Sequence, residues 1–504
     1  MLSWREIFIY SENTPLIFSQ YLFLFLFTIG FGVFTLLHKN LRVRNIYLLA
    51  FSLFFYYKSG GLYFWILVFS TFVDYWCGNA IFKAVAKSRK NLFLIISLVS
   101  NLGMLFFFKY SYYFVGLING WLGTELKAIN FLAAFSNMSF GTHHDIFEIF
   151  LPVGISFYTF QTLSYSIDIY RGNLKPARSI VDFGFFVTFF PQLVAGPIVR
   201  ASDFLPQIYQ KYHRTREQFG AAVFLIMSGM FKKMVVSDYI SINFVDRVFD
   251  NPMLYNGFSN LMAVYGYSIQ IYCDFSGYSD MAIGLAALLG FTLPLNFNSP
   301  YKATSITDFW RRWHISLSSW LRDYLYISLG GNRKGKIRTY VNLMLTMLLG
   351  GLWHGAATRF IVWGGLHGLA LAIHKIWMQY VPWAESGSKW YKYLMGVITF
   401  HFVAFCWIYF RAKDMLAVNH MLGQIFTNFR GHGVWEVIVE YKWIFFVMFI
   451  GFFGHYLPRN WKDSAAGWYS RVPDVAKAAI FAVVIFIAYQ AQSADIQPFI
   501  YFKF

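Results

Sequence analysis

Charged residues are scarce in this sequence. Only 13% of its 504 residues are Asp, Glu, Lys or Arg, whereas a soluble domain carries about 25%. Hydrophobic residues make up 57% of the chain, and several long stretches hold no charge at all; the clearest are 17–37, 91–108, 251–273, 339–358 and 393–410. This composition excludes an ordinary soluble protein and predicts an integral membrane protein.

Cysteine is also rare. The three residues, Cys77, Cys273 and Cys406, are odd in number, far apart and set in apolar neighbourhoods. This pattern argues against a disulfide framework and against a zinc site, so we expect no metal. The three thiols are expected to pack as small buried hydrophobes.

The apolar runs are continuous rather than alternating, which favours helices over a transmembrane barrel. A helix needs roughly 20 apolar residues to cross the hydrocarbon core. The predicted fold is therefore all-α: a polytopic transmembrane helical bundle of about 11 spans with additional short or re-entrant helices. The segments around Gly60 and Gly61 should form a hinged pair. With no cleavable signal peptide apparent, the first span should be retained.

The net charge of +18 comes from short loops between apolar runs. We attribute it to positive loops on the cytoplasmic side rather than to nucleic-acid binding. The basic clusters at 39–44 and 83–90 then place the N-terminus outside, and a loop of about 40 residues before Leu151 should be external. His143 and His144 in that loop should be solvated. The rule fails at 183–199, which is basic on both sides, so a segment near there should be re-entrant or cross the membrane incompletely. The region of about 180–370 is expected to line a cavity.

Residues 296–340 form the densest polar cluster. Ser305 and Asp308 should open a helix as a capping pair, and Asp308 can pair with Arg312 one turn later. Continued helical spacing would place His314 on a largely apolar stripe, with the helix ending at Gly330 and Gly331. The arginines of this region have two open readings, binding a phosphate or snorkelling to the interface; they are Arg311, Arg312 and Arg322.

His354 is the one residue in the uncharged run 339–358 whose side chain ordinarily titrates near neutral pH. The small residues around it allow close approach of a helix or substrate. Imidazole suits a general base near neutral pH, although a buried packing role is equally compatible with the pattern. His367 is similar by spacing alone. Asp274 and Asp280 would either bind substrate, pair internally, or cap a helix broken at Ser276 and Gly277.

Several motifs, taken together, resemble the membrane-bound O-acyltransferase family. The similarity is strongest to its bacterial alginate O-acetylation branch, with D-alanyl transfer proteins more distant. It runs through LPVGISFYTFQTLSYSIDIYRG (151–172), FFPQLVAGPIVR (189–200), YCDFSGYSDMAIG (272–284), NFNSPY (296–301), FWRRWHISLSSWLRDYLYISLGGNR (309–333) and LLGGLWHGA (348–356). The resemblance implies a single membrane domain over 1–504 around a central tunnel. Its motif core would lie at about 150–370, with peripheral spans at 1–110 and 385–504.

The resemblance also implies roles for individual residues. His354 corresponds to the catalytic histidine of the family and His314 to its second histidine, whereas His367 reverts to a structural role. The side chains expected to help bind substrate or donor are Trp310, Trp313, Trp353, Arg311, Arg312, Arg322, Asp274 and Asp280. His354 would take the proton of an acceptor hydroxyl, and His314 would hold the acceptor or stabilise the oxyanion.

The implied reaction passes an acyl group, acetyl in this branch, from a cytoplasmic thioester such as acetyl-CoA to a polysaccharide. No tightly bound cofactor is expected. The resemblance also implies that the chain resides in a bacterial inner membrane. Its implied extracytoplasmic partner is an SGNH-hydrolase-like acetyltransferase of the AlgJ or AlgX type. The segment 120–150 is longer than the family pattern, and the region after about 385 matches only as generic spans. Alginate, cellulose, peptidoglycan or another glycan therefore stay open as acceptors. D-alanyl transfer, a transporter or flippase, and an inactive scaffold stay open as alternative functions.

Overall fold

The computed structural model describes residues 4–11, 14–194, 196–381, 388–429 and 433–491. Residues 385–387, 430–432 and 492–504 of the expected C-terminal peripheral region lie outside these ranges. Every regular element in the described ranges is a helix. The chain divides into two compact units: unit 1 is Met1–Leu16, Asn40–Val194 and Arg200–Gln210, and unit 2 is Ile17–Lys39, Ala195–Val199 and Lys211–Phe504.

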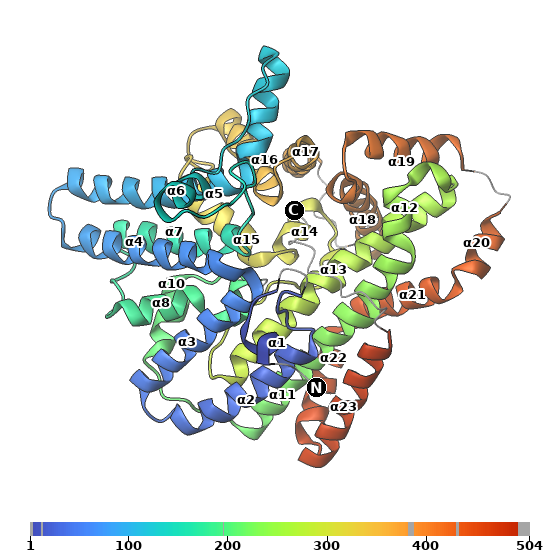
Figure 1. Cartoon of the computed structure of the whole chain (residues 1–504). Helices are drawn as coiled ribbons and strands as arrows, with labels where there is room; N and C mark the ends of the chain where they lie inside the picture. The colour runs from blue at the N-terminus through green and yellow to red at the C-terminus, as the bar shows by residue number, and fades with distance from the viewer. Residues whose placement is uncertain (1–3, 12–13, 195, 382–387, 430–432, 492–504) are drawn as a thin grey trace. The chain divides into compact units, whose positions relative to one another are not determined.

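Unit 1 holds the first hairpin of long helices and several short ones. Its elements are α1 (Trp4–Phe8), α3 (Leu41–Gly60), η1 (Gly61–Tyr63), α4 (Phe64–Lys83), α5 (Lys87–Leu122), α6 (Phe131–Phe140), α7 (Ile155–Tyr170), α8 (Ile180–Thr188), α9 (Phe190–Leu193) and α10 (Ala201–Ile208). Figure 1 shows α4 and α5 side by side. The predicted hinge is confirmed, because α3 ends at Gly60 and Gly61 turns the chain at a φ of 63°.

Unit 2 holds most of the expected motif core, whose residues 151–194 and 200–210 belong to unit 1. Its elements are α2 (Tyr21–Leu37), α11 (Arg216–Met230), η2 (Phe231–Asp238), η3 (Ser241–Val245), α12 (Asp246–Asp250), η4 (Pro252–Leu254), α13 (Gly257–Leu288), η5 (Pro300–Lys302), α14 (Ile306–Arg312), α15 (Ile315–Trp320), η6 (Leu321–Tyr326), α16 (Lys336–His354), α17 (Thr358–Tyr380), α18 (Lys389–Arg411), α19 (Met415–Thr427), α20 (Val434–Glu440), α21 (Lys442–Tyr456), α22 (Arg459–Arg471) and α23 (Asp474–Ala491). The segments η2, η3 and η6 are π-helical, a form that often marks functional sites.

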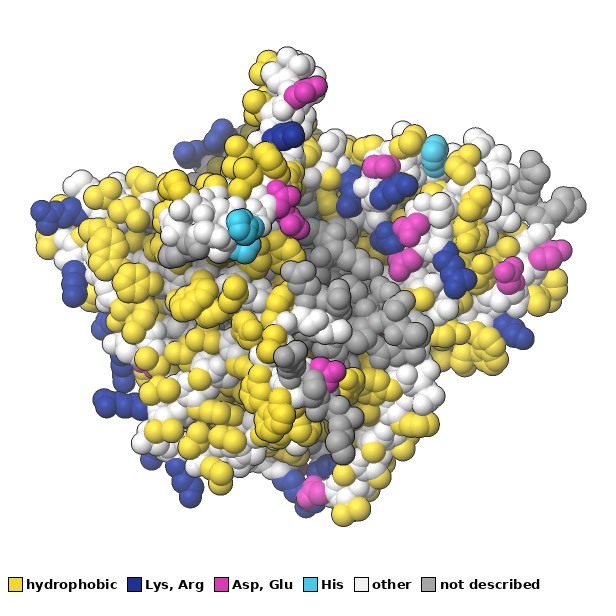
Figure 2. Space-filling view, viewed as in Figure 1, with side chains coloured by type: hydrophobic (Ala, Val, Ile, Leu, Met, Phe, Trp, Pro, Cys, Tyr) yellow, Lys and Arg dark blue, Asp and Glu magenta, His cyan; other side chains and the backbone are white. Residues whose placement is uncertain are grey.

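Six of the described helical segments are long and apolar enough to cross a membrane, or seven if the bent pair α20 and α21 counts as one. The expected total of about 11 spans stays a prediction. Helix α5 shows the lipid-facing pattern, since Ile95, Val99 and Phe106 are all about half exposed or more. Figure 2 shows hydrophobic side chains over broad areas of the face in view. Such large exposed apolar areas suit a hydrocarbon surround.

Polar caps define where many of these helices begin. Ser179 caps α8, Asn256 caps α13, and Thr215 forms a complete capping box with Gln218 at the start of α11. The predicted cap at Ser305 is confirmed, because its hydroxyl accepts the Asp308 N–H at 3.1 Å. Helices α8 and α9, with nine and four residues, are too short to cross a bilayer at about 1.5 Å per residue. They agree with an incomplete crossing near 183–199.

Four expected elements differ in the structure. The external loop after residue 108 is largely helical, because α5 continues to Leu122 and α6 follows; the histidine pair at 143–144 in it is exposed, as expected. The uncharged run 251–273 is not a separate span, since α13 begins at Gly257 and continues to Leu288. The possible break at Ser276 and Gly277 is therefore absent. The run 339–358 contains a helix end at His354 and a new helix start at Thr358.

The fourth difference concerns the helix expected to continue from Ser305 through His314. It ends at Arg312, Trp313 is extended, and His314 lies in the left-handed region at a φ of 43°. The Ile315 N–H bonds to Asn296 O at 2.9 Å instead of to a carbonyl one turn earlier. This long-range contact replaces the helical bond and causes the break.

The contact between α11 and α13 depends on paired glycines. A Cβ built at Gly277 would lie 2.7 Å from Gly229 O, and one built at Gly229 would lie 2.5 Å from Gly277 O. These two backbones, seen side by side in Figure 1, touch with no room for a methyl group. Close backbone approach through small residues is a common device of membrane helices.

We expect Gly277→Ala to destabilise the protein by about 1–3 kcal/mol, the usual cost of overpacking a tight contact. The thermal unfolding midpoint in detergent, followed by tryptophan fluorescence, should fall. Gly103→Ala is the matched control, because a Cβ there meets nothing within 4 Å. Equal midpoints for the two variants would contradict this account of the contact.

Candidate active site

The helix break after α14 gives His314 its position. The residue stands in a left-handed conformation between α14 and α15, and its side chain is fully buried. Left-handed backbone is uncommon for a residue other than glycine, and such strain persists only where surrounding contacts hold it. The contacts that hold His314 come from Asn296.

Asn296 is a buried hydrogen-bonding hub. Its Oδ1 accepts the Ser316 hydroxyl at 2.9 Å and lies 3.4 Å from the Ser316 N–H and 3.1 Å from His314 Nδ1. Because a backbone N–H can only donate, this atom is an acceptor, so the proton of His314 must sit on Nδ1. The Nε2 atom of the neutral ring therefore carries a lone pair. Asn296 was not among the site residues expected from the sequence. It begins the NFNSPY motif, but a separation of 18 residues from His314 gives no sign of a contact.

The surroundings of His314 keep it neutral. The ring of Phe275 packs edge-on at 4.6 Å. Burial lowers the pKa of His314 to about 3. A neutral imidazole with a lone pair on Nε2 can accept a hydrogen bond or a proton, but it cannot donate to an oxyanion from that atom.

His354 is the last residue of α16 and is 2% exposed. Its ring contacts Trp363 at 5.0 Å and Phe410 at 5.3 Å, both edge-on. The next residue is Gly355, where a larger residue has no room, because a Cβ there would lie 2.0 Å from the Phe360 ring. The expected close approach of α16 to a neighbour is also present, since a Cβ at Gly351 would lie 2.3 Å from Phe360 O.

Trp353 connects the two histidines. Its ring centroid lies 5.0 Å from that of His354 and 6.3 Å from that of His314. His314, Trp353 and His354, three of the expected site residues, thus lie together, although His314 and His354 are 40 positions apart in the sequence. Trp313 lies in the same aromatic cluster, 4.9 Å from Trp407, and Trp310 lies 5.8 Å from Trp363.

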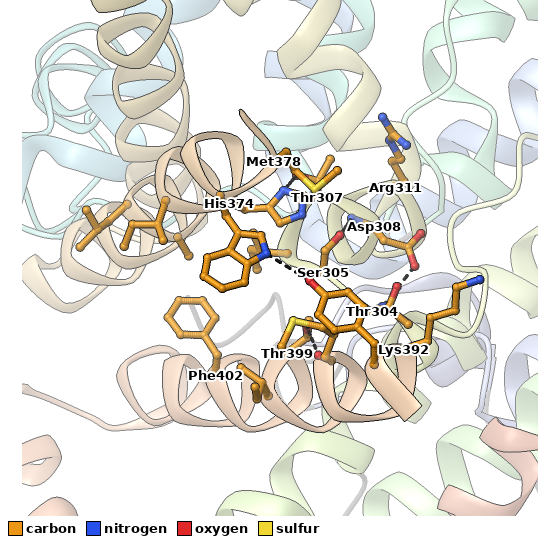
Figure 3. Close-up of a pocket in the computed structure, with 18 of the residues that line it drawn as sticks. Thr304, Ser305, Thr307, Asp308, Arg311, His374, Met378, Lys392, Thr399 and Phe402 are labelled. Atoms are coloured by element: carbon orange, nitrogen blue, oxygen red, sulfur yellow. Dashed lines mark hydrogen bonds between the residues drawn. The ribbon is translucent and has the colours of Figure 1, made fainter. Parts of the chain in front are cut away.

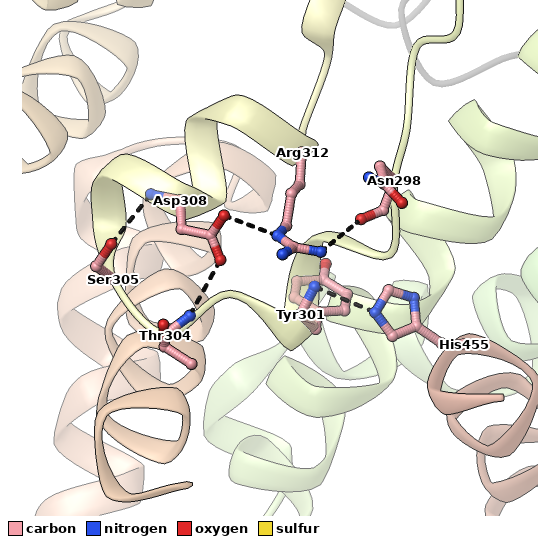
Figure 4. Close-up of polar contacts among 7 residues, drawn as sticks. All are labelled: Asn298, Tyr301, Thr304, Ser305, Asp308, Arg312 and His455. Carbon is pink, nitrogen blue, oxygen red and sulfur yellow. Dashed lines mark hydrogen bonds and ion pairs between the residues drawn. The ribbon is translucent and has the colours of Figure 1, made fainter. Parts of the chain in front are cut away.

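The three arginines fall into different settings. Arg312 pairs with Asp308 at 2.9 Å, as expected from their spacing, and also reaches Asn298 O (Figure 4). Arg322 is exposed and pairs with its neighbour Asp323 at 2.6 Å. Arg311 has no carboxylate partner within the described part of the chain and lines a cavity of about 890 Å³ between α14, α17 and α18.

The two aspartates of α13 are paired internally. Buried Lys233 contacts Asp274 at 2.6 Å and Asp238 at 2.7 Å, and Lys232 pairs with Asp280. These pairs link η2 to α13 and explain why α13 continues past both carboxylates. The three cysteines are buried, as expected.

His367 is a further histidine of the same region. It is fully buried, and neither ring nitrogen has a hydrogen-bond partner among the described residues. Its ring contacts Trp363 at 4.8 Å and Phe402 at 5.7 Å. Trp363 touches His354, while Phe402 lines the 890 Å³ cavity shown in Figure 3. A series of ring contacts therefore runs from this cavity to His354.

Comparison with known proteins places this arrangement in a family. The profile of the membrane-bound O-acyltransferase family matches residues 177–412, which include both His314 and His354. The chain is 40% identical to a probable alginate O-acetylase AlgI of Pseudomonas aeruginosa, over 84% of this chain and 76% of the relative. The chain belongs to the membrane-bound O-acyltransferase family. This membership decides for an O-acyltransferase over a transporter.

Other relatives of this O-acyltransferase differ in their acceptors. It is 36% identical to a peptidoglycan O-acetyltransferase of Helicobacter pylori, over 85% of this chain and 82% of the relative. It is 30% identical to a teichoic acid D-alanyltransferase of Bacillus subtilis, over 54% of this chain and 71% of the relative.

Asn296→Ala should slow acyl transfer roughly tenfold, about 1.4 kcal/mol in the barrier, because His314 loses the acceptor that fixes its tautomer and orientation. The measurement is the transfer rate at saturating donor, with unfolding midpoints as the folding check. Asn243→Ala is the control, since its amide donates only within its own helical segment, to Tyr239 O. A rate equal to that of the control would refute the positioning role.

His367→Phe should keep or raise the thermal midpoint while lowering acyl transfer. The substitution removes buried ring nitrogens whose desolvation costs about 1–3 kcal/mol, and it retains an aromatic ring. Retention of full transfer activity by a stable variant would show that His367 serves packing alone.

Proposed function

We propose that the protein transfers acetyl from a cytoplasmic thioester, acetyl-CoA, towards a hydroxyl of an exopolysaccharide or cell-wall glycan. The observation that carries the proposal is the pair of buried histidines that both contact Trp353, inside the segment that the family profile covers. The names of the relatives from Pseudomonas aeruginosa and Helicobacter pylori support an O-acetyl product.

His354 is the proposed general base. The acceptor hydroxyl attacks the thioester carbonyl while His354 takes its proton, and a tetrahedral intermediate forms. When the intermediate collapses, the carbon–sulfur bond breaks. His354 returns that proton to the sulfur, which leaves as a thiol. The thioester supplies a good leaving group, so activation of the hydroxyl is the main demand on the protein.

His314 is proposed to hold the acceptor. The lone pair on its Nε2, fixed by the Asn296 contact at Nδ1, can accept a hydrogen bond from a sugar hydroxyl. The alternative, stabilisation of the oxyanion, needs a donor at Nε2 and has no support from this tautomer. Oxyanion stabilisation then falls to other groups of the site.

The donor is proposed to occupy the 890 Å³ cavity of Figure 3. Arg311 and Lys392 give its mouth two cations for phosphate groups, while Asp308 is already paired with Arg312. Guanidinium and ammonium groups suit phosphate oxygens. The ring contacts through Phe402 and His367 lie between this cavity and His354, and the acyl end would follow that direction.

The remaining expectations belong to the same proposal. The chain would reside in a bacterial inner membrane with its N-terminus outside. An SGNH-hydrolase-like partner would receive or complete the transfer to the glycan. D-alanyl transfer is the second candidate, but the D-alanyl relatives match only about half of the chain, whereas the O-acetyl relatives match most of it.

His354→Ala should abolish transfer of label from radiolabelled acetyl-CoA to the partner or to a glycan hydroxyl. The assay uses the purified full chain in detergent with its SGNH-type partner. His401→Ala is the matched control, because His401 is exposed and bonds only to Val397 O within its own helix. Loss of a general base typically costs 10²–10⁴-fold in rate.

Three outcomes separate the hypotheses. Transfer by wild type and by His401→Ala, but not by His354→Ala, supports the proposal. Transfer by His354→Ala at the wild-type rate rejects the base. Transfer from a D-alanyl carrier protein but not from acetyl-CoA would assign the second candidate instead.

A further inference from the structure

A second cavity of about 830 Å³ lies in unit 2 and is lined in part by α13. It is bounded by α11, η2, α13, α21, α22 and residues 295–299. Neither the catalytic step nor the donor cavity uses it. Its lining separates into a cationic end and an apolar wall.

The cationic end is defined by two lysines, one that lines the cavity and one beside it. Lys462 lines the cavity and donates to His455 O at 3.4 Å, and neighbouring Lys302 donates to Leu457 O at 2.9 Å. Within the described ranges neither ammonium has a carboxylate partner. Burial, then the nearby charges of Lys302 and Lys232, lower the pKa of Lys462 to about 8. The two carboxylates that line the cavity are already paired, Asp280 with Lys232 and Asp463 with Arg459. The ammonium groups of Lys462 and Lys302 therefore attract an anion.

His455 adds a buried donor to the same end. The backbone N–H of Tyr301 donates to its Nε2 at 3.1 Å (Figure 4). A backbone N–H cannot accept, so the imidazole proton must sit on Nδ1. His455 is 2% exposed and lines the cavity, yet Nδ1 has no acceptor among the described residues. A buried donor without an acceptor is costly, and a ligand oxygen would relieve that cost.

The opposite wall is apolar and continues into a lipid-facing surface. Phe224, Leu225 and Ile450 line it, and Phe453 both lines it and is 56% exposed. Further along α21, Phe449 is 64% exposed. Trp461 of helix α22 lines the cavity and is 61% exposed. Tryptophan is typical of the membrane interface. An occupant must therefore combine an anionic head with hydrocarbon.

We propose that this cavity binds an anionic phospholipid of the surrounding bilayer. Its phosphate would accept from Lys462, Lys302 and the Nδ1–H of His455, and an acyl chain would lie against the apolar wall. The diphosphate of the acyl donor shares the phosphate chemistry, but its adenosine and ribose do not match a wall that opens on exposed phenylalanines.

The lipid would also support the active site. Phe297 and Asn298 line the cavity, and they directly follow Asn296, which holds His314. Phe297 packs at 4.9 Å on Phe275, which touches the His314 ring. An occupied cavity would restrain the segment on which the orientation of His314 depends.

The test measures lipid binding on the full chain and needs no acyl transfer. The protein is delipidated in detergent and given phosphatidylglycerol, phosphatidylcholine or diacylglycerol. Native mass spectrometry counts retained lipid, and tryptophan fluorescence gives the unfolding midpoint. We expect phosphatidylglycerol to be retained and to raise the midpoint. Diacylglycerol, which has the chains but no phosphate, should do neither.

Paired substitutions locate the site. The double variant Lys302→Ala with Lys462→Ala should weaken phosphatidylglycerol retention at least tenfold. The control, Lys334→Ala with Lys336→Ala, removes the same charge from two exposed residues at or just before the start of α16 and should retain the lipid. His455→Phe, which removes the donor but keeps a ring, should weaken retention as well.

Three results would overturn the proposal. The first is stabilisation by diacylglycerol equal to that by phosphatidylglycerol, a comparison that uses the wild type alone. The second is equal loss of lipid in the control pair. The third is displacement of phosphatidylglycerol from wild type by coenzyme A, which would assign the cavity to the donor.

Discussion

An apolar surround leaves the backbone N–H and C=O groups of a chain with only one another to bond. Long helices meet this constraint in the periphery, as in α5 and α18. The site is where the chain departs from it. There the backbone breaks at His314 and after His354. A backbone hydrogen bond follows each break, from Ile315 N–H to Asn296 O in the first case and from Ala357 N–H to Gly355 O in the second. Irregular backbone in a membrane protein is tolerated where protein buries it, and both histidines are enclosed.

Enclosure also sets the chemistry available to the two rings. Aromatic side chains surround them, with Phe275 against His314 and Trp363 against His354. His314 is held neutral by burial, with its tautomer fixed by an amide oxygen rather than by an acid. A neutral imidazole in a buried aromatic site avoids the cost of a buried charge. Such a site suits a thioester, whose leaving group needs little assistance, better than an unactivated amide.

Local signals in the sequence were sufficient for local structure. The cap at Ser305, the Asp308–Arg312 pair and the hinge at Gly60 and Gly61 all follow from residues within a few positions of one another. The break at His314 does not, because it depends on Asn296, 18 residues earlier, and a helical period gives no warning of it. The pairs of Lys232 and Lys233 with α13 join residues more than 40 positions apart. The tautomer of His455 depends on Tyr301, 154 positions away. Family resemblance supplied the two histidines, but it said nothing of these partners.

The seven-residue helix α14 lines the 890 Å³ cavity and is hydrogen-bonded to a residue that lines the second one. Arg311 faces the first cavity, while the side chain of its neighbour Arg312 pairs with Asp308 and donates to Asn298 O. The Asn298 N–H donates to Arg312 O in return, so the end of α14 and the segment after Asn296 are fixed to each other. The next residues along the chain are Trp313 and His314. Any ligand that orders Asn298 on one side or Arg311 on the other therefore acts on the same short piece of backbone. The orientation of His314 is where those two effects meet.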